Sequence, residues 1–277
     1  MPNSPRPLIM GILNITPDSF SDGGRFVRID RAIGHALAMA EAGADFIDVG
    51  GESTRPGATP VTPEVQCERV VEVIEALRGA LPGAVRISID TTLTAVARPA
   101  LDVGAEVVND ISAGRDDPAM FALCAEREAT LALMHMRGRP ATMNLAPRYD
   151  DVVAEVLSFL RARVALAEAA GIPRERIWLD PGIAFGKRRC DNLALLAHLG
   201  GLVATGYPIL LGVSRKRFMG SVVREQDPSA LLPATLAATA LGVMAGVRIL
   251  RVHDVAENRQ AADTAWAVRE AMLASGD

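Results

Sequence analysis

A glycine placed between a helical pattern and an apolar strand recurs along this chain. The phrase takes the forms AGADFIDVG from Ala42, VGAEVVNDI from Val103, AGIPRERIWLDPG from Ala170 and AGVRILRVHD from Ala245. A glycine in this place is typical of the end of a helix, and the apolar run behind it predicts a buried strand. The chain is therefore constrained to pass repeatedly from helix to strand.

Four further apolar runs, at 8–13, 85–90, 130–134 and 208–213, bring the expected strands to eight. Stretches of helical length and period, such as 150–170 and 229–245, follow the strands. Strand and helix alternate at a spacing of roughly 35 residues without a linker, which is typical of parallel βαβ units. We therefore predict the α/β class and a single (β/α)8 TIM-barrel domain over residues 1–277. A doubly wound open sheet is the alternative, weakened because no G-x-G-x-x-G follows the first strand.

Charge and cysteine content argue against several classes of partner and site. The net charge is −4, so no global basic field draws the chain to nucleic acid or anionic lipid. The three cysteines, Cys67, Cys124 and Cys190, are odd in number and widely spaced, which argues against a disulfide framework and against a zinc site. The N-terminus has no basic segment followed by an apolar one, and no run approaches the roughly 18 apolar residues of a membrane span. We expect a soluble cytoplasmic protein with neither a nucleic-acid nor a membrane partner.

Polar side chains follow nearly every expected strand. In a (β/α)8 barrel these strand ends meet on one face, which carries the active site. Asp90, Asn109 and Asp180 come directly after the apolar runs ISI, EVV and IWL. Burial of such groups costs several kcal/mol unless partners satisfy them, so the set predicts a ligand rich in hydrogen-bond donors. The strand-end set is Asn14, 51–55, Asp90, Asn109, Asp110, His135, Asp180, 214–217, Arg251 and His253.

These residue types suit two kinds of ligand group. A fused aminopyrimidinone offers a ring N–H beside an exocyclic amine, and a carboxylate accepts such a fork through two parallel bonds. Asp90 and Asp180 suit these forks, and Asn109 can both donate and accept. Phosphate groups suit the cations at other strand ends, because Arg binds them bidentately and Lys acts as a point charge. The cations are Arg55, Lys216, Arg251 and His253.

Eight short motifs, in order along nearly the whole chain, resemble those of the dihydropteroate synthase family. They are GILNITPDSFSDGG, DVGGESTRPGA, ISIDTT, VNDISAG, LMHMRG, LDPGIAFGK, GVSRKRFMG and RVHDV. The family has a (β/α)8 fold, in agreement with the independent strand count, and its members act in folate biosynthesis and are inhibited by sulfonamides. The resemblance implies a transferase that joins 6-hydroxymethyl-7,8-dihydropterin diphosphate to 4-aminobenzoate, forming 7,8-dihydropteroate and diphosphate.

The resemblance also implies a mechanism and roles for individual residues. Loss of diphosphate leaves a pterin cation that 4-aminobenzoate captures, with Mg²⁺ as the cofactor. We expect fixed cations at Arg251 and His253 to neutralise the leaving diphosphate, and Asp90 to offset the charge that develops on the pterin. The catalytic set implied by the resemblance is Asp90, Lys216, Arg251 and His253.

The substrate contacts that the resemblance implies are more numerous. The pterin contacts are Asp90, Asn109, Met134, Asp180, Gly212, Lys216 and Arg251. The 4-aminobenzoate and lid-loop contacts are Thr16, Asp18, Phe20, Ser53, Thr54, Arg55, Pro56, Phe185 and Ser214. The diphosphate contacts are Asn14, Arg251 and His253, and the metal contact is Asn14. His135 is a candidate for a supporting position behind these residues.

The resemblance implies further properties and leaves two alternatives open. The loops after the first two strands are expected to close over the substrates, although TPDS alone is also typical of an ordinary turn. Ala184 and Arg188 depart from the family pattern, where a glycine and a threonine are common. We expect sulfonamides to compete with 4-aminobenzoate, and a homodimer to form through a face such as LAATALGVMAG. The alternatives are a non-catalytic pterin-binding paralogue and a pterin-dependent methyltransferase domain.

Overall fold

The computed structural model describes residues 5–15, 25–53 and 61–275. Within these residues, eight parallel strands form one sheet in the order β6-β5-β4-β3-β2-β1-β8-β7. A single bridge between Leu179 and Ile209 joins the two ends of this order, so the sheet closes into the predicted (β/α)8 barrel. The strands are β1 (Leu8–Asn14), β2 (Phe46–Gly50), β3 (Arg86–Asp90), β4 (Val107–Asp110), β5 (Thr130–Met134), β6 (Ile177–Asp180), β7 (Leu210–Leu211) and β8 (Ile249–Val252).

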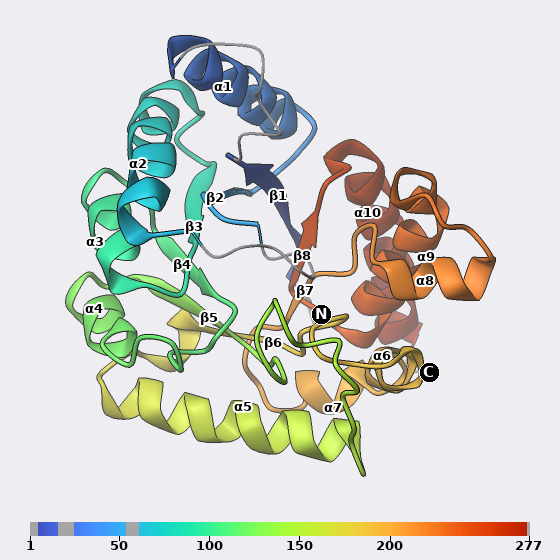
Figure 1. Cartoon of the computed structure of the whole chain (residues 1–277). Coiled ribbons are helices and arrows are strands. Elements are labelled where there is room, and N and C mark those ends of the chain that lie inside the picture. Colours follow the sequence, from blue (N-terminus) through green and yellow to red (C-terminus); the bar gives the residue numbers. More distant parts are fainter. Residues whose placement is uncertain (1–4, 16–24, 54–60, 276–277) are drawn as a thin grey trace.

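Helices ring the barrel in chain order (Figure 1). They lie outside the strands, where they cover the outward-facing side chains of the sheet. The helices are α1 (Arg25–Glu41), α2 (Pro63–Ala80), α3 (Thr94–Asp102), α4 (Met120–Glu126), α5 (Val152–Ala169), α6 (Arg189–Ala197), α7 (Leu199–Val203), α8 (Arg217–Val223), α9 (Leu232–Ala245) and α10 (Val255–Ser275). Short 3-10 turns, Arg174–Arg176 and Pro228–Leu231, precede β6 and α9.

The bounds of these elements follow the predicted ranges, with two informative differences. The strand expected over 208–213 is reduced to Leu210–Leu211, and Pro208 at its start has no N–H to donate to a ladder. The helix expected over 229–245 divides into a 3-10 turn and α9, with Pro233 in the first turn of α9. Proline is tolerated there because the first helical N–H groups have no intrahelical acceptor.

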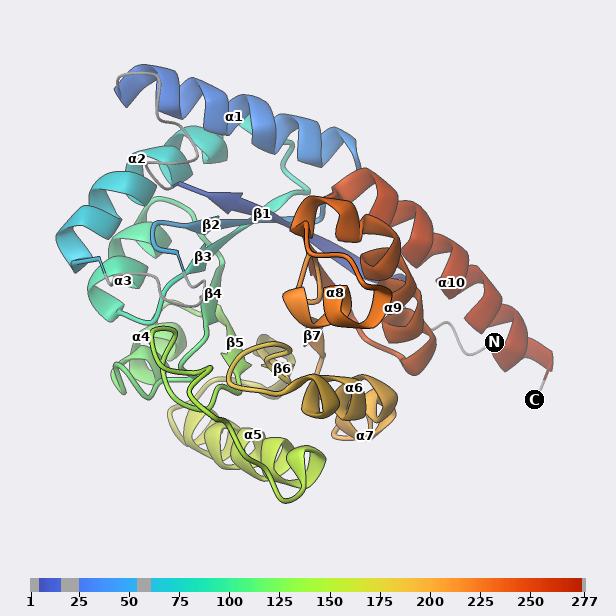
Figure 2. The ribbon, with the colours of Figure 1, turned by 45° about the vertical axis from the view of Figure 1, so that its right-hand side comes forward.

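The outer face of β1 shows how closely the helices approach the barrel. Figure 2 shows α1 and α10 beside β1. A Cβ atom at Gly11 would lie 2.6 Å from the sulfur of Met39 in α1 and 3.2 Å from Val255 Cγ2 in α10. Glycine at this position therefore lets both helices contact the strand.

Apolar side chains fill the inside of the barrel near the amino ends of the strands. Phe46 and Trp178 meet edge to face, with ring centroids 5.2 Å apart. Because side chains alternate along a strand, the residues two positions further on also face the interior, nearer the carboxyl ends. The full apolar layer is Met10, Phe46, Val107, Ala132, Trp178, Leu210 and Ile249.

One described helical stretch, Pro228–Ala245, is long and apolar enough to cross a membrane when judged by length and composition alone. In the barrel this stretch packs against α10, and residues of α9 such as Thr235, Ala238 and Thr239 are buried. It therefore forms part of the helical wall of the fold.

Candidate functional site

A polar layer replaces the apolar one toward the carboxyl ends of the strands. On β2 the inward side chain that follows Phe46 is Asp48, and on β3 Ser88 is followed by Asp90. The carboxylates, amide and hydroxyl of this layer are taken out of water, so each needs a partner within the barrel. The buried polar residues of the layer are Asp48, Ser88, Asp90, Asn109 and Asp180.

Arg251 of β8 is the cation at the centre of this layer. Its Nε donates to Asp48 Oδ2 at 2.6 Å, and its Nη2 donates to Asp90 Oδ2 at 2.7 Å. Asn109 Nδ2 donates to the same Asp48 oxygen at 3.0 Å. Burial opposes the charge on Arg251, but the two carboxylates outweigh it and hold the pKa of Arg251 above its ordinary value. Four strands thus contribute to one hydrogen-bonded cluster.

The carboxyl group of Asp90 is poised between its two protonation states. Burial raises the pKa of Asp90 to about 7, and nearby Asp48 and Asp110 act in the same direction, while Arg251 opposes the shift. A group with such a pKa, in a cluster at the end of a barrel, is a candidate functional residue. Asp90, which is predicted to offset the charge on the pterin, therefore has a protonation state that is sensitive to small changes in its surroundings.

Asp180 forms a second acidic position at the end of β6. Its Oδ1 accepts a hydrogen bond from the Gly182 amide at 2.7 Å. Burial raises the pKa of Asp180 to about 6, against the effects of the Gly182 amide and of Lys216. Burial also lowers the pKa of Lys216 to about 8, with Arg251 adding to the effect. The structure thus brings together two acids and two cations named from the sequence.

An apolar wall borders these charges. Met134 at the end of β5 packs with Ile111, Met136 and Met143, and Phe185 contacts this group. The Nζ atom of Lys216 lies 4.3 Å from the centre of the Phe185 ring, within the range of a cation–π contact. A flat ring could therefore bind between apolar side chains and a polar edge, as expected for a heterocycle.

His135 and Lys187 lie together in a second buried centre. Lys187 Nζ donates to the carbonyl oxygens of Gly182, Phe185 and His135 at 2.9, 3.1 and 3.2 Å, and it lies 2.9 Å from His135 Nδ1. Burial lowers the pKa of Lys187 to about 7, and burial beside Lys187 lowers the pKa of His135 to about 2. The neutral ring nitrogen of His135 accepts from Lys187, so His135 supports the loop after β6.

His253 follows β8 and contacts Ser214. Its Nδ1 lies 2.9 Å from Ser214 Oγ, and its backbone N–H donates to the same oxygen at 3.2 Å. Burial, together with Arg251, lowers the pKa of His253 to about 4. His253 is therefore neutral at pH 7 in this environment, in contrast to the fixed cation expected from the sequence.

Asn14 at the end of β1 offers an oxygen to a cation. A Cβ atom at Gly50 would lie 3.4 Å from Asn14 Oδ1 and 3.8 Å from Asp90 Oδ2, so Gly50 lies beside both of these side chains. The described residues contain no cluster of three His, Cys, Asp or Glu side chains able to hold a metal. A single amide oxygen fits Mg²⁺, which keeps waters and binds through few protein ligands together with phosphates.

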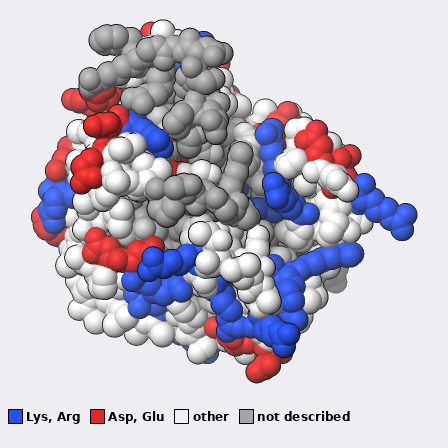
Figure 3. Space-filling view, viewed as in Figure 1, with Lys and Arg blue, Asp and Glu red and all other residues white. Residues whose placement is uncertain are grey.

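Several predicted site residues lie outside the described residues. Ser53 is the last described residue after β2, and the other predicted residues of the two lid loops lie outside the described ranges. Figure 3, which views the carboxyl ends of the strands, shows Lys and Arg side chains below and to the right of the undescribed residues. The predicted residues outside the described ranges are Thr16, Asp18, Phe20, Thr54, Arg55 and Pro56.

The departures from the family pattern have separate consequences. Ala184 has a φ of 68°, in the left-handed region that favours glycine. Arg188 donates to Asp191 through its backbone N–H, Nε and Nη2, each at 2.8 Å, at the start of α6. The alanine therefore occupies an unfavourable backbone conformation, whereas the arginine pairs its added charge locally.

Sequence reasoning missed Asp48 and Lys187 as members of the site. A signal for Asp48 exists, because a carboxylate in the buried strand FIDVG lies two residues from Phe46 and shares its face. Lys187 closes the motif LDPGIAFGK, but nothing in that motif indicates that its side chain is buried.

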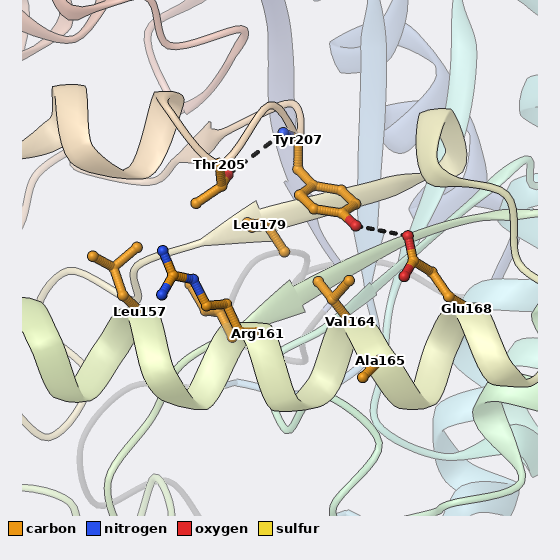
Figure 4. A pocket seen from close by; sticks show the side chains of 9 residues that line it. Leu157, Arg161, Val164, Ala165, Glu168, Leu179, Thr205 and Tyr207 are labelled. Carbon is orange, nitrogen blue, oxygen red and sulfur yellow. Dashed lines mark hydrogen bonds between the residues drawn. The ribbon is translucent and has the colours of Figure 1, made fainter.

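A pocket on the outer wall of the barrel has a different character (Figure 4). It lies between α5, β6 and the segment before β7, with an empty volume of about 430 Å³ that includes open solvent. Apolar side chains such as Leu157, Val164 and Leu179 line most of it, and Tyr207 donates to Glu168 at 2.6 Å. It has no converging cluster of acids and cations like that in the barrel, so the barrel mouth is the better candidate site.

Comparisons with known proteins show what this chain is similar to. The family model for "Pterin binding enzyme" matches residues 10–253. A dihydropteroate synthase from Synechocystis is 44% identical over 264 residues, which are 94% of this chain and 91% of that protein. The dihydropteroate synthase of Xanthomonas albilineans, solved with 4-aminobenzoic acid, superposes with a TM-score of 0.88 at 45% identity, covering 95% and 93% of the two chains. The Yersinia pestis enzyme, solved with a sulfonamide drug, superposes with a TM-score of 0.89 at 40% identity, covering 96% and 95%.

Proposed function

This chain belongs to the pterin-binding enzyme family, and from that membership together with the geometry of the barrel mouth we propose how it works as a dihydropteroate synthase. The observation that carries the proposal is the meeting of Asp90, Arg251, Asp180 and Lys216 beside the Met134 wall. The reaction joins 6-hydroxymethyl-7,8-dihydropterin diphosphate to 4-aminobenzoate and belongs to folate biosynthesis.

The pterin ring binds across the polar layer. Asp180 accepts from the ring N–H and the exocyclic amine, because a carboxylate matches that fork with two parallel bonds. Asn109 completes the polar edge, while Met134 and Gly212 border the ring. The Cβ position of Gly212 lies 4.0 Å from Asp180 Oδ2, so Gly212 lies beside that carboxylate.

The chemical step separates charge, and this chain supplies both counter-charges. The bond between the pterin methylene carbon and the diphosphate oxygen breaks, and its electron pair leaves with diphosphate. Arg251 and Lys216 stabilise the departing anion, and neutral His253 donates a hydrogen bond to it. Asp90 in its charged form offsets the pterin cation at low local dielectric.

The second substrate then attacks the cation. The amine nitrogen of 4-aminobenzoate forms the new bond to the methylene carbon and afterwards loses a proton to solvent. An arylamine is already neutral near pH 7, so no general base is required for the attack. Phe185, Ser214 and Ser53 border its site, together with the lid-loop residues, and sulfonamides compete there as analogues of 4-aminobenzoate.

Mg²⁺ is the proposed cofactor, held by Asn14 together with the diphosphate. When bound, it supplies positive charge to the diphosphate leaving group. Asn14 and Asp90 flank Gly50 at the ends of neighbouring strands, which supports this placement.

An assay of diphosphate release tests the function against its alternatives. We expect release that requires both the pterin diphosphate and 4-aminobenzoate, and that Asp180→Asn abolishes. Pterin binding without release would identify a non-catalytic paralogue. Methyl transfer from a methylated pterin to a corrinoid acceptor, without diphosphate release, would identify a methyltransferase.

The protein acts as a cytoplasmic homodimer without nucleic-acid or membrane partners. Helix α9 contacts both α8 and α10, and each of the three carries exposed apolar side chains, among them Val223, Leu241 and Met272. Leu241 is 62% exposed and lies on α9, the helix that contacts the other two. Light scattering of the wild type and of Leu241→Glu tests this, because the variant should be a monomer and the wild type a dimer.

A further inference from the structure

Asp48 lies beneath the proposed substrate site and belongs to no role assigned so far. Its side chain is 0% exposed, and it follows Phe46, a residue of the apolar layer, on the inner face of β2. Its oxygen Oδ2 accepts hydrogen bonds from both Asn109 and Arg251, at 3.0 and 2.6 Å. Its other oxygen, Oδ1, has no hydrogen-bond partner among the described residues.

The contact with Asn109 fixes which way that amide faces. A carboxylate only accepts hydrogen bonds, so Asn109 must direct its NH₂ group toward Asp48. The opposite end of the amide is the carbonyl oxygen, an acceptor. The carbonyl oxygen of Asn109 therefore faces a ligand edge that presents N–H donors and can accept from it. If the amide were turned round, its NH₂ group would face those N–H donors and no hydrogen bond could form.

The contact with Arg251 uses a different part of the guanidinium. Nε faces Asp48 and Nη2 faces Asp90, so two of the three nitrogens are held by carboxylates. Nη1 makes no hydrogen bond within the described part of the chain, which leaves its donors for a ligand anion. The planar guanidinium has fixed donor directions, so the two carboxylates determine where Nη1 points.

We propose that Asp48 is a positioning residue that couples the pterin-ring and diphosphate subsites, because its single oxygen Oδ2 fixes Asn109 and Arg251 relative to each other. The proposal rests on the proposed function for the identity of the ligands. It requires no contact between Asp48 and either substrate. A shift of either partner by about 1 Å is enough to cost on the order of 100-fold in rate.

The test is Asp48→Asn, which keeps the size of the side chain and removes its charge. We expect kcat/KM for the pterin diphosphate to fall about 100-fold, while KM for 4-aminobenzoate stays within about twofold of the wild type. Titration calorimetry with the pterin alcohol and with inorganic diphosphate measures binding directly. In the wild type each ligand should strengthen binding of the other, and in Asp48→Asn this mutual effect should disappear. Equal losses in kcat/KM for the pterin diphosphate and for 4-aminobenzoate would overturn the proposal. So would an Asp48→Asn variant in which the two ligands still strengthen each other's binding as in the wild type.

A control variant separates positioning from general damage. Asp45→Asn lies just before the same strand but at the other end of the barrel, where Asp45 accepts from the Ile9 amide at 2.7 Å and lies 3.5 Å from Arg259. This variant should retain wild-type kinetics. A pterin-specific loss in Asp45→Asn would contradict the proposal.

A double-mutant cycle provides an independent measurement. If Asp48 acts through Arg251, then Asp48→Asn should cost far less in an Arg251→Lys background than in the wild type. Additive losses would overturn the proposal. Should Asp48→Asn fail to fold, Asp48→Glu keeps the charge but displaces it by one methylene, and the same pterin-specific loss is expected. Absence of turnover in the wild type would refute the proposed function, whereas the binding experiment would still test the coupling.

Discussion

Two buried ionic centres lie in the same barrel mouth, and they stabilise charge in different ways. The Arg251 centre pairs its guanidinium with the carboxylates of Asp48 and Asp90. The Lys187 centre surrounds its ammonium with three backbone carbonyls and the neutral ring of His135. The first centre uses carboxylates from strands that are far apart in the sequence, and the second uses dipoles from two adjacent loops.

Because their charges are stabilised differently, the two centres can perform different functions. The paired carboxylates hold the guanidinium in place, so its remaining donors can bind a ligand anion. An ammonium held by carbonyls fixes the backbone that supplies them, here the loops after β5 and β6. We infer that the Arg251 centre takes part in binding and chemistry, whereas the Lys187 centre holds the loop that carries Phe185.

Removing the cation of the Arg251 centre should have the largest effect. Arg251→Met leaves two buried carboxylates facing each other without a counter-charge, and we expect a loss of about 3–5 kcal/mol in the free energy of unfolding. Turnover should also be lost. Urea denaturation near pH 7.5 measures the stability. The double variant Asp48→Asn/Arg251→Met should recover part of it, and no recovery would contradict the charge-pair account.

Removing the cation of the Lys187 centre should cost less stability and affect a different substrate. Lys187→Met leaves carbonyl dipoles unsatisfied but no opposing charge, so we expect a loss of about 2 kcal/mol. KM for 4-aminobenzoate should rise about tenfold because Phe185 loses its support, with KM for the pterin diphosphate unchanged. Arg189→Met, at an exposed position two residues along, is the matched control. An equal rise of the KM values for 4-aminobenzoate and for the pterin diphosphate would show that the loop affects both substrate sites.

The two centres should give stability opposite dependences on pH. The pKa of Asp90 rises from 3.8 to about 7 on folding, so between these pH values the native state binds more protons than the unfolded chain. Stability from this group falls as pH rises. The pKa of Lys187 falls from 10.5 to about 7, so between these values the unfolded chain binds more protons and stability rises with pH. Each slope is at most about 1.4 kcal/mol per pH unit.

Denaturation of the wild type, Asp90→Asn and Lys187→Met at a series of pH values measures both slopes. Subtracting the Asp90→Asn curve from that of the wild type should give a difference that decreases between pH 4 and 7. The corresponding difference for Lys187→Met should increase above pH 7. A flat difference would mean that the group keeps its ordinary pKa, and slopes of the same sign would mean that one of the two pKa values shifts in the opposite direction.

The smallest expected effect concerns the loop that Lys187 holds. Ala184 adopts a positive φ, and Ala184→Gly should relieve that conformation and raise the free energy of unfolding by about 1 kcal/mol. Ala194→Gly, within helix α6, is the control and should lower it by about the same amount. Thermal unfolding resolves both shifts. Destabilisation by Ala184→Gly would show that the loop does not strain this residue.

The strand-end residues could be predicted because each one stands directly after an apolar run in the sequence. Asp90, Asn109 and Asp180 come at the carboxyl ends of apolar runs, and parallel strands bring those ends to one face. The cluster around Asp48 could not be predicted in this way. Asp48 lies within its strand, and its partner Arg251 is 203 positions away in the sequence.

The protonation states could not be predicted either, because they depend on burial and on neighbours from other strands. His253 was expected to be a cation, but burial beside Arg251 lowers the pKa of His253 to about 4. Lys187 lies in a loop motif of ordinary polarity, and its pKa is lowered to about 7 only because the loop after β6 folds over it.

The sequence by itself determined the alternation of strand and helix and the polar residues at the strand ends. These depend on local backbone preferences and on the order of apolar and polar residues along the chain. Only the tertiary structure decided which charges meet. Strands β2 and β8 flank β1 in the closed sheet, which brings Asp48 against Arg251, and exclusion of water there sets the strength and the protonation of the whole cluster.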